Sequence, residues 1–255
     1  MRQVIVAGNW KLNKTVHEAL DTVTRLKREI SQVTYCKVIV CPPFTALAEV
    51  DDVITDSNVR LGAQDMYWED AGAFTGEVSG PMLKDVGCSY VIIGHSERRQ
   101  FFGETNETVN KKVKAALRCG LIPIICCGEL LKEREADQTN QVLKSHIEGA
   151  FKDVAEKDAE KCVVAYEPVW AIGTGKVATP AQAQDAHKFI RGLLSSLYSA
   201  KLAESVSILY GGSVKPENFG DILHGPDVDG ALVGGASLEA ASFSALVKIA
   251  AQVRV

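Results

Sequence analysis

An acidic side chain, Glu167, stands at the end of a short apolar run and is the first candidate for chemistry in this chain. Residues 162–166 are apolar and partly β-branched, as a buried strand requires, and Pro168 ends that strand because it cannot donate to a sheet. The apolar residues that follow lead into Gly173-Thr174-Gly175, where the glycines permit backbone torsions that other residues resist. The pattern predicts a general base with a hinged apolar lid beside it.

Eight short apolar runs recur along the chain and predict the strands that must position this chemistry. They lie at 4–7, 37–41, 59–63, 90–93, 122–126, 162–166, 207–210 and 230–233. Helical patterns alternate with them; the clearest helix start has Thr179 as N-cap, Pro180 at the first position and Gln182 completing a capping box. Strands buried on both faces read as continuous apolar runs. We therefore predict an α/β fold in which residues 1–255 form a single domain, a closed (β/α)8 barrel rather than an open doubly wound sheet.

Further reactive side chains follow other strands of the predicted barrel. Asn9 and Lys11 follow the first strand and His95 follows the fourth, as Glu167 follows the sixth. A parallel barrel collects its active site at the carboxyl ends of its strands, so these groups should share one face. We expect the helix that begins after His95 to lower the pKa of the imidazole and keep it neutral. A lysine at a strand end can also be simply exposed, but the neighbours of Lys11 favour charge stabilisation.

Glycine turns follow the last two predicted strands. Gly211-Gly212 precede Ser213, and Gly234-Gly235 follow the eighth strand. Such turns let backbone N–H groups approach an anion, and a helix N-terminus adds its dipole. Ser237 is a candidate cap for the short helix that follows. One glycine pair alone would indicate a tight turn, but two pairs after the last two strands favour a phosphate site.

The other histidines and the charges after His95 are more typical of structural roles. We expect surface positions for the helical residues His17, His146 and His187, and a polar turn at His224. Glu97, Arg98 and Arg99 form either a solvated charge run or an ion-pair network that supports the site, and we favour structural roles for both arginines.

The composition is that of an ordinary globular protein. The chain has 46% hydrophobic and 24% charged residues and a net charge of −4, so we expect neither nucleic-acid nor membrane partners. The seven cysteines lie mostly in apolar runs and not at metal-ligand spacings, which favours buried, reduced thiols and no metal. A strand that begins at residue 4 leaves no room for the apolar core of a signal peptide. We expect a cytoplasmic protein.

The longest irregular stretch spans residues 65–80. It exceeds an ordinary βα loop, and it contains Gly72-Ala73-Phe74-Thr75-Gly76-Glu77. We expect this stretch to be functional or to bind a partner.

Taken in order, these motifs resemble the triosephosphate isomerase family from end to end. The matching segments are Gly8-Asn9-Trp10-Lys11, residues 72–77, Gly94-His95-Ser96-Glu97-Arg98-Arg99, Cys127-Gly128-Glu129, residues 165–175, Tyr210-Gly211-Gly212-Ser213 and residues 232–236. The resemblance implies a TIM barrel that isomerises a small phosphorylated triose, dihydroxyacetone phosphate to D-glyceraldehyde 3-phosphate, with no cofactor, in glycolysis and gluconeogenesis.

The resemblance also assigns roles to residues. It implies that Glu167 is the base, His95 the electrophile and Lys11 the electrostatic partner, with Asn9 positioning Lys11 and Glu97 supporting the site. It places the phosphate on N–H groups of Gly173, Ser213, Gly234 and Gly235. The implied lid comprises Pro168, Val169, Trp170, Ala171, Ile172, Gly173, Thr174, Gly175 and Lys176. The loop residues Phe74, Thr75 and Gly76 would dock into a second subunit near Lys11 and His95, making a homodimer.

Three other functions are weighed against this one. Residues 173–178 fit a G-x-G-x-x-A pattern, but a dinucleotide site should open a helix directly, with an acidic residue at a strand end about 20 positions later, and here Asp185 falls within a helix. A Schiff-base aldolase would use Lys11 as its nucleophile. A non-catalytic phosphate binder would keep the glycine turns, with no need for Glu167 and His95 to face them.

Overall fold

Eight parallel strands close into a barrel in this computed structural model, which describes residues 2–171 and 177–253. The strands are β1 Val4–Asn9, β2 Cys36–Cys41, β3 Val59–Ala63, β4 Tyr90–Ile93, β5 Ile122–Cys127, β6 Val163–Tyr166, β7 Ile208–Tyr210 and β8 Gly230–Val233. Each pairs in parallel with the next along the chain, and β8 returns to β1 with Ile5 opposite Gly230. The predicted closed (β/α)8 barrel is confirmed.

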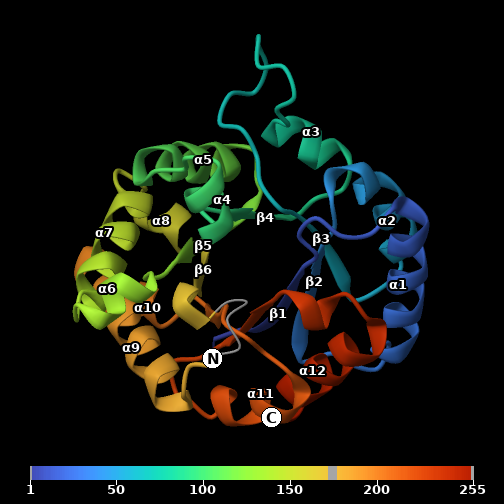
Figure 1. Cartoon of the computed structure of the whole chain (residues 1–255). Coiled ribbons are helices and arrows are strands. Elements are labelled where there is room, and N and C mark those ends of the chain that lie inside the picture. The colour runs from blue at the N-terminus through green and yellow to red at the C-terminus, as the bar shows by residue number, and fades with distance from the viewer. Residues whose placement is uncertain (1, 172–176, 254–255) are drawn as a thin grey trace.

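Helices surround the barrel as an outer ring (Figure 1). They are α1 Val16–Glu29, α2 Leu47–Ile54, α3 Gly80–Asp85, α4 Ser96–Phe101, α5 Asn106–Arg118, α6 Leu131–Glu135, α7 Thr139–Phe151, α8 Glu156–Ala159, α9 Pro180–Leu197, α10 Ala200–Ala203, α11 Pro216–Leu223 and α12 Ala240–Val253, with short 3-10 turns η1 Phe44–Ala46, η2 Val169–Ala171 and η3 Gly235–Ser237. The predicted capping box is present on α9: the Gln182 N–H donates to Thr179 Oγ1 at 3.2 Å, and the Thr179 N–H donates to Gln182 Oε1 at 2.9 Å.

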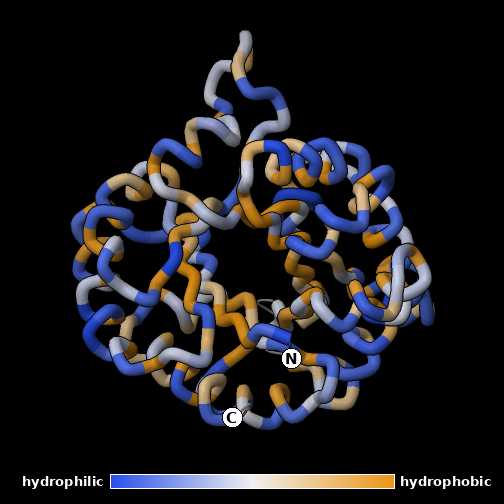
Figure 2. The backbone as a smooth tube through the Cα atoms, turned by 180° about the vertical axis from the view of Figure 1, so that it is seen from behind, coloured by the Kyte–Doolittle hydropathy of each residue, from blue (hydrophilic) through white to orange (hydrophobic). Residues whose placement is uncertain are grey.

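Alternate residues of each strand face two different cores. Side chains such as Ile5, Ala7 and Ile92 pack inside the barrel, while Val4, Val6 and others pack against the helices. Burial on both faces explains why the strands read as continuous apolar runs. In Figure 2 the strand segments around the centre are mostly hydrophobic, and hydrophilic stretches lie mainly on the outside.

The segment between β3 and α3 projects beyond the helical ring, at the top of Figure 1. At its root the Tyr67 N–H donates to the Val78 carbonyl at 2.8 Å, and the Tyr67 ring lies against the Phe74 ring with centroids 4.6 Å apart. Residues 71–77 at the tip are exposed, and α3 begins at Gly80. The segment is therefore an exposed arm with an ordered base.

Two of the histidines placed at the surface are not fully exposed, which corrects the sequence prediction. His187 is fully buried and its ring lies edge-on to Tyr166; burial lowers its pKa to about 4. His146 is half-buried, whereas His17 and His224 are exposed as predicted. The error arose because helical spacing does not by itself say which helix face meets the barrel.

The thiols agree with the sequence prediction. All seven cysteines are free, and six of them are buried, while Cys119 is partly exposed. Among the helices of the described ranges, none is both long and apolar enough to cross a membrane.

Candidate active site

A cavity of about 680 Å³ opens at the carboxyl ends of the strands. It brings together eight of the nine residues predicted to act on or bind substrate. Asn9, Lys11, His95, Glu97, Glu167, Ser213, Gly234 and Gly235 all line it. Gly173, the ninth, lies outside the described residues. Side chains that follow four different strands therefore meet in one place.

Glu167 is only 1% exposed, and its carboxylate is held by two neighbours. The Ser96 N–H donates to Oε2 at 3.0 Å, the Ser96 hydroxyl donates to Oε1 at 3.2 Å, and His95 Nε2 lies 2.9 Å from Oε1. Burial alone would raise the pKa of Glu167, but His95 and Ser96 together hold that pKa below its ordinary value. The Glu167 carboxylate is thus ionised, and both of its oxygens have hydrogen-bond partners.

His95 is the N-cap residue of α4, as its position before a charged helical segment suggested. Its Nδ1 accepts a hydrogen bond from the Glu97 N–H at 3.2 Å. A nitrogen that accepts a hydrogen bond carries no proton, so this contact favours the neutral ring with its proton on Nε2, facing Glu167.

The predicted direction of the His95 pKa shift is wrong for this state. Burial would lower the pKa of His95, yet the Glu167 carboxylate beside it raises the pKa above its ordinary value. The prediction followed from the dipoles of the helix after His95, whereas the structure also places the Glu167 carboxylate in direct contact with the ring. Burial, the charge of Lys11 and the Glu97 N–H on Nδ1 still favour the neutral form.

Lys11 is held in place from both sides. Its backbone adopts a left-handed φ of 54°, which is uncommon for a residue with a side chain. The Lys11 N–H donates to Asn9 Oδ1 at 3.0 Å, and Gln64 Nε2 donates to the Lys11 carbonyl at 3.0 Å. The Lys11 ammonium group lies 2.6 Å from Glu97 Oε1. These contacts hold Lys11 at the wall of the cavity that Glu167 also lines.

The glycine turns leave open backbone at the cavity wall. A side chain at Gly235 would meet nothing within 4 Å, and one at Gly234 would project toward Lys11, whose Cε would be 3.4 Å away. Within the described ranges, the N–H groups of Ser213, Gly234 and Gly235 donate to no other protein group. They are therefore available to an anion.

Ser237 does not cap a helix, which corrects another prediction. Gly234 takes the N-cap place of η3, and the buried Ser237 hydroxyl donates to the Gly234 carbonyl at 2.7 Å. A Cβ atom at Gly8 would stand 2.8 Å from Ser237 Cβ, so Ser237 packs closely against β1. Its hydrogen bond to the Gly234 carbonyl helps to hold the Gly234-Gly235 turn.

The start of the predicted lid contacts Glu129, a fully buried carboxylate. Trp170 Nε1 donates to Glu129 Oε1 at 2.8 Å, and the Val169 N–H donates to the Glu129 carbonyl at 3.1 Å. Pro168 lies against Gly212, where a side chain would come 2.9 Å from its ring. The remaining lid residues, Ile172, Gly173, Thr174, Gly175 and Lys176, fall outside the described residues.

Sequence reasoning missed three residues that organise the site. Ser96 was quoted only as part of a motif, although both of its donors hold Glu167. Gln64 joins the Lys11 and Cys41 carbonyls, at 3.0 and 2.9 Å. Glu129 anchors the lid. Their common signal is a polar residue within three positions of the end of a buried strand, which could have marked them.

Fold and site together define an enzyme of the (β/α)8 barrel class, with a carboxylate, an imidazole, an ammonium group and two glycine turns at the carboxyl face of its strands. The triosephosphate isomerase family model matches residues 4–250, and the chain belongs to this family. It is therefore an isomerase.

Individual relatives agree over nearly the whole chain. Triosephosphate isomerase of Geobacter metallireducens is 56% identical over 247 residues, covering 97% of this chain and 98% of the relative. The enzyme of Endomicrobium trichonymphae is 55% identical over 248 residues, covering 97% and 99%. The crystal structure of triosephosphate isomerase from Bartonella henselae superposes with a TM-score of 0.89 at 39% identity, covering 97% of this chain and 98% of that one.

Proposed function

We propose that Glu167 is the base with which this chain interconverts dihydroxyacetone phosphate and D-glyceraldehyde 3-phosphate. The observation that carries this assignment is the contact between Glu167 Oε1 and His95 Nε2, 2.9 Å apart in a cavity that also holds Lys11. A proton shift beside a carbonyl group requires a carboxylate base and an imidazole donor that can both reach the substrate, and this contact places the two side by side on the wall of one cavity. The small phosphorylated triose is the only partner that the reaction needs, and no cofactor takes part.

The proton balance of the reaction assigns a role to each group. Glu167 takes the proton from one carbon and becomes a carboxylic acid, which leaves an enediolate. His95 donates from Nε2 to the oxygen that gains charge and recovers a proton from the neighbouring hydroxyl. Glu167 then returns its proton to the adjacent carbon. Lys11 stabilises the negative charge that develops on the oxygens.

Glu167 must exchange its present partners for substrate before it can act. Its bonds to Ser96 and His95 lower its pKa and so weaken it as a base. Movement away from these donors, under the apolar cover of residues 168–176, would raise the pKa. The same cover would keep water from the enediolate and prevent loss of its phosphate.

The phosphate is proposed to lie on the free N–H groups of Ser213, Gly234 and Gly235, with Gly173 added from the lid. Open space at Gly235 and the proximity of Gly234 to Lys11 support this placement. Phosphate binding would then draw the lid over the base, so that binding and proton transfer are coupled.

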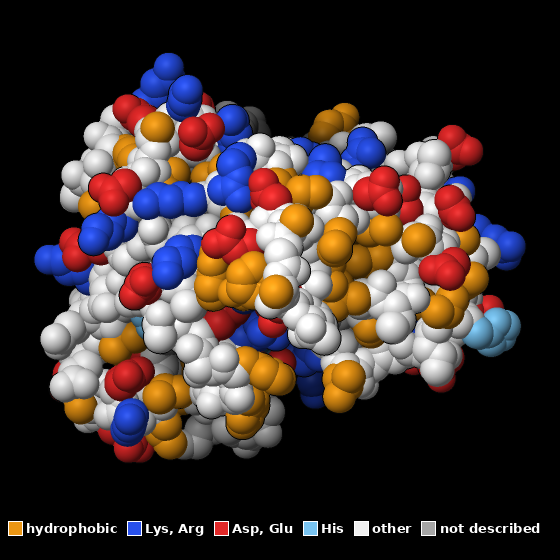
Figure 3. Space-filling view, turned by 90° about the horizontal axis from the view of Figure 1, so that it is seen from above, with side chains coloured by type: hydrophobic (Ala, Val, Ile, Leu, Met, Phe, Trp, Pro, Cys, Tyr) orange, Lys and Arg blue, Asp and Glu red, His pale blue; other side chains and the backbone are white. Residues whose placement is uncertain are grey.

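We further propose a homodimer in which Phe74, Thr75 and Gly76 dock into the partner near Lys11 and His95. All three are exposed at the tip of the projecting arm. Exposed large hydrophobic side chains support an apolar interface: Leu12, 98% exposed, Phe44, Phe74, Met82, Phe101 and Phe102. Several hydrophobic patches lie on the face from which the arm projects, among polar and charged surface (Figure 3). Sedimentation that finds a fully active monomer would exclude this dimer.

We also propose that residues 1–255 act as one catalytic domain in the cytoplasm, serving glycolysis and gluconeogenesis, with no nucleic-acid or membrane partner. The free thiols and the net charge of −4 support this setting.

Turnover of glyceraldehyde 3-phosphate in a coupled isomerase assay tests the function. Glu167→Asp withdraws the carboxylate by about one methylene, and a misplacement of ~1 Å should lower kcat roughly a hundredfold. An unchanged kcat would contradict the assignment of the base. Borohydride treatment in the presence of substrate should trap no adduct on Lys11, which separates this enzyme from a Schiff-base aldolase.

A further inference from the structure

A second, smaller cavity of about 230 Å³ adjoins the active site. Ser96, Gln100, Glu167 and Val169 line both cavities. The smaller one extends outward between the ends of β4 and β5 and the helix α7, where it reaches His146. None of the catalytic steps above uses this histidine, although it is the one residue of α7 on the cavity wall.

His146 makes a specific contact with the chain that follows β5. Its Nδ1 accepts a hydrogen bond from the Gly128 N–H at 3.3 Å. Burial and the nearby Arg99 lower the pKa of His146 to about 3, while Glu167 opposes that shift only in part. The ring therefore stays neutral at physiological pH, with its proton on Nε2 and Nδ1 free to accept.

Gly128 in turn lies against the backbone of Glu167. A Cβ atom at Gly128 would stand 1.7 Å from the Glu167 carbonyl oxygen, which shows how closely the two backbones approach. The preceding residue, Cys127, accepts a hydrogen bond from the Glu167 N–H at 2.8 Å. The segment 127–128 therefore sets the position of the Glu167 backbone, and His146 holds this segment from the opposite side.

We propose that His146 is a positioning residue for the catalytic base, acting through Gly128. The inference rests on the proposed role of Glu167. A loss of the Nδ1 acceptor would release the Gly128 N–H and let the chain that carries Glu167 shift. Small displacements of a base cost rate more than substrate affinity, because the phosphate is held elsewhere.

Two substitutions distinguish the effect of the Nδ1 hydrogen-bond acceptor from the effect of the volume of the side chain. His146→Leu removes the acceptor and should lower kcat roughly tenfold, with KM changed less than about twofold. His146→Asn offers Oδ1 close to the place of Nδ1 and should keep kcat within about threefold of the wild type. His224→Leu, at an exposed histidine, is the matched control and should leave both constants unchanged.

A measurement on the unaltered protein provides a test that does not depend on activity or on the folding of a variant. Nitrogen NMR of the histidine rings should find His146 neutral near pH 7, with Nε2 protonated and Nδ1 unprotonated.

NMR of the variants follows the contact itself. The Gly128 amide proton should shift in His146→Leu and return toward its wild-type position in His146→Asn.

The outcomes are distinct. A protonated Nδ1, an equal kcat for His146→Leu and the wild type, or equal losses in both His146 variants would each overturn the proposal, as would a change confined to KM. If no isomerase activity exists in the wild type, the proposed function fails, while the ring tautomer and the Gly128 shift still report whether the contact exists.

Discussion

Ser96 holds the Glu167 carboxylate with both of its hydrogen-bond donors, the N–H at 3.0 Å from Oε2 and the hydroxyl at 3.2 Å from Oε1. With His95 as a third donor, neither carboxylate oxygen is left unpaired. The same residue begins α4, the helix that His95 caps, so one strand end supplies both the imidazole and the restraint on the base. The pKa of Glu167 in the free enzyme is accordingly set by Ser96 as well as by His95.

Replacement of Ser96 by alanine should therefore raise the pKa of Glu167, because the hydroxyl donor is lost while the N–H remains. In the wild type the lowered pKa keeps Glu167 ionised to lower pH. In the variant the higher pKa should protonate Glu167 at a higher pH, so kcat/KM should begin to fall at a higher pH on acidification. A hydrogen bond to an ionised carboxylate contributes roughly 1.5 kcal/mol or more, so its loss should move the acid limb by roughly one pH unit or more. Profiles of kcat/KM against pH for Ser96→Ala and for Ser196→Ala, an exposed helix serine, would measure it; superimposable acid limbs would refute the prediction.

Lys11 and Glu97 should differ in their contributions although they form one ion pair. Lys11→Met keeps the length of the side chain but removes the charge that we propose stabilises the enediolate, so kcat/KM should fall by about 10²–10³, the usual effect of losing one such group. Glu97→Gln keeps an acceptor for the lysine and should cost roughly tenfold. Steady-state kinetics in both directions measure the two effects. If Lys11→Met and Glu97→Gln lower kcat/KM equally, the ion pair acts only as a structural contact.

The strands could be predicted from the sequence because nearly all of their residues are buried, on both faces of the sheet. The run 59–63 matches β3 at both ends, although Arg60 within it is exposed. The strand β1 extends past its predicted end to Asn9, because Gly8 and Asn9 are buried in the sheet without reading as apolar. The start of α9 was predictable because Thr179, Pro180 and Gln182 specify it locally.

The contacts within the site could be predicted only where they follow from position on a strand. The gathering of Lys11, His95 and Glu167 follows from barrel topology alone. The hydrogen bonds from Ser96 to Glu167 join residues 71 positions apart and depend on side-chain torsions, which no local pattern encodes. The direction of the His95 pKa shift likewise depends on a long-range contact, the one between His95 and Glu167, and was missed for this reason.

Asp65, at the root of the projecting arm, should make stability depend on pH. It lies buried beside Lys112, Arg98 and a second carboxylate, Glu104. Burial raises the pKa of Asp65 to about 6, although Lys112 opposes the shift, so the folded chain holds the Asp65 proton more tightly than the unfolded chain does. This contribution favours folding at low pH and is lost as pH rises from about 4 through 6.

Asp65→Asn removes that dependence. From pH 5 to pH 8, the free energy of unfolding of the variant relative to wild type should shift by about 1 kcal/mol in favour of the variant. Urea unfolding at fixed protein concentration measures this. Asp70→Asn is the matched control, because Arg118 lowers the pKa of the exposed Asp70 and that carboxylate is ionised throughout the range. A constant difference for Asp65→Asn would show that its carboxyl does not titrate there.

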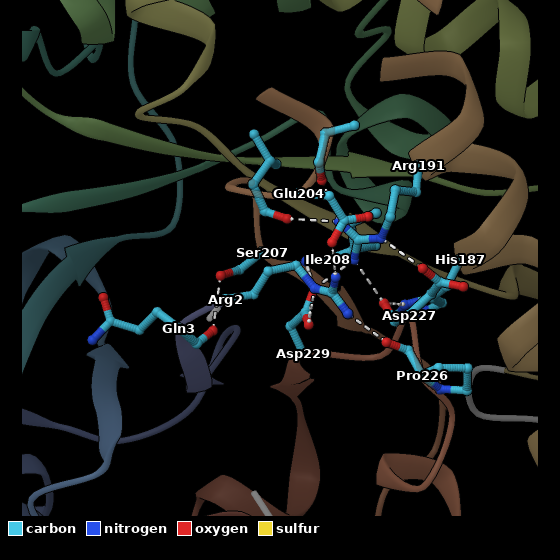
Figure 4. A network of polar contacts seen from close by, with 12 residues as sticks. Arg2, Gln3, His187, Arg191, Glu204, Ser207, Ile208, Pro226, Asp227 and Asp229 are labelled. Carbon is cyan, nitrogen blue, oxygen red and sulfur yellow. Dashed lines mark hydrogen bonds and ion pairs between the residues drawn. The ribbon is translucent and has the colours of Figure 1, made fainter. Parts of the chain in front are cut away.

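Arg191 should govern stability without affecting catalysis, because its network lies at the opposite end of the barrel from the active site. Its guanidinium group is 2.6 Å from Asp227 and 2.7 Å from the buried Asp229, which directly precedes β8; Arg2 reaches the same Asp229 (Figure 4). Arg191 Nη1 also donates to the Val206 carbonyl at 3.1 Å. Replacing one partner of a buried ion pair leaves the other charge uncompensated, which costs about 3 kcal/mol or more.

Arg191→Met should therefore lower the free energy of unfolding by about that amount, while kcat per folded molecule stays within twofold of the wild type, a margin of roughly 0.4 kcal/mol. The exposed pair Arg25 and Asp21 provides the comparison, since Arg25→Met should cost less than about 0.5 kcal/mol. Denaturant unfolding at one protein concentration, followed by activity assays well below each transition, separates stability from turnover. The carbonyl and carboxylate groups around Arg191 need hydrogen-bond donors. If Arg191→Met and Arg25→Met lower the free energy of unfolding equally, water or Arg2 must replace the missing guanidinium group.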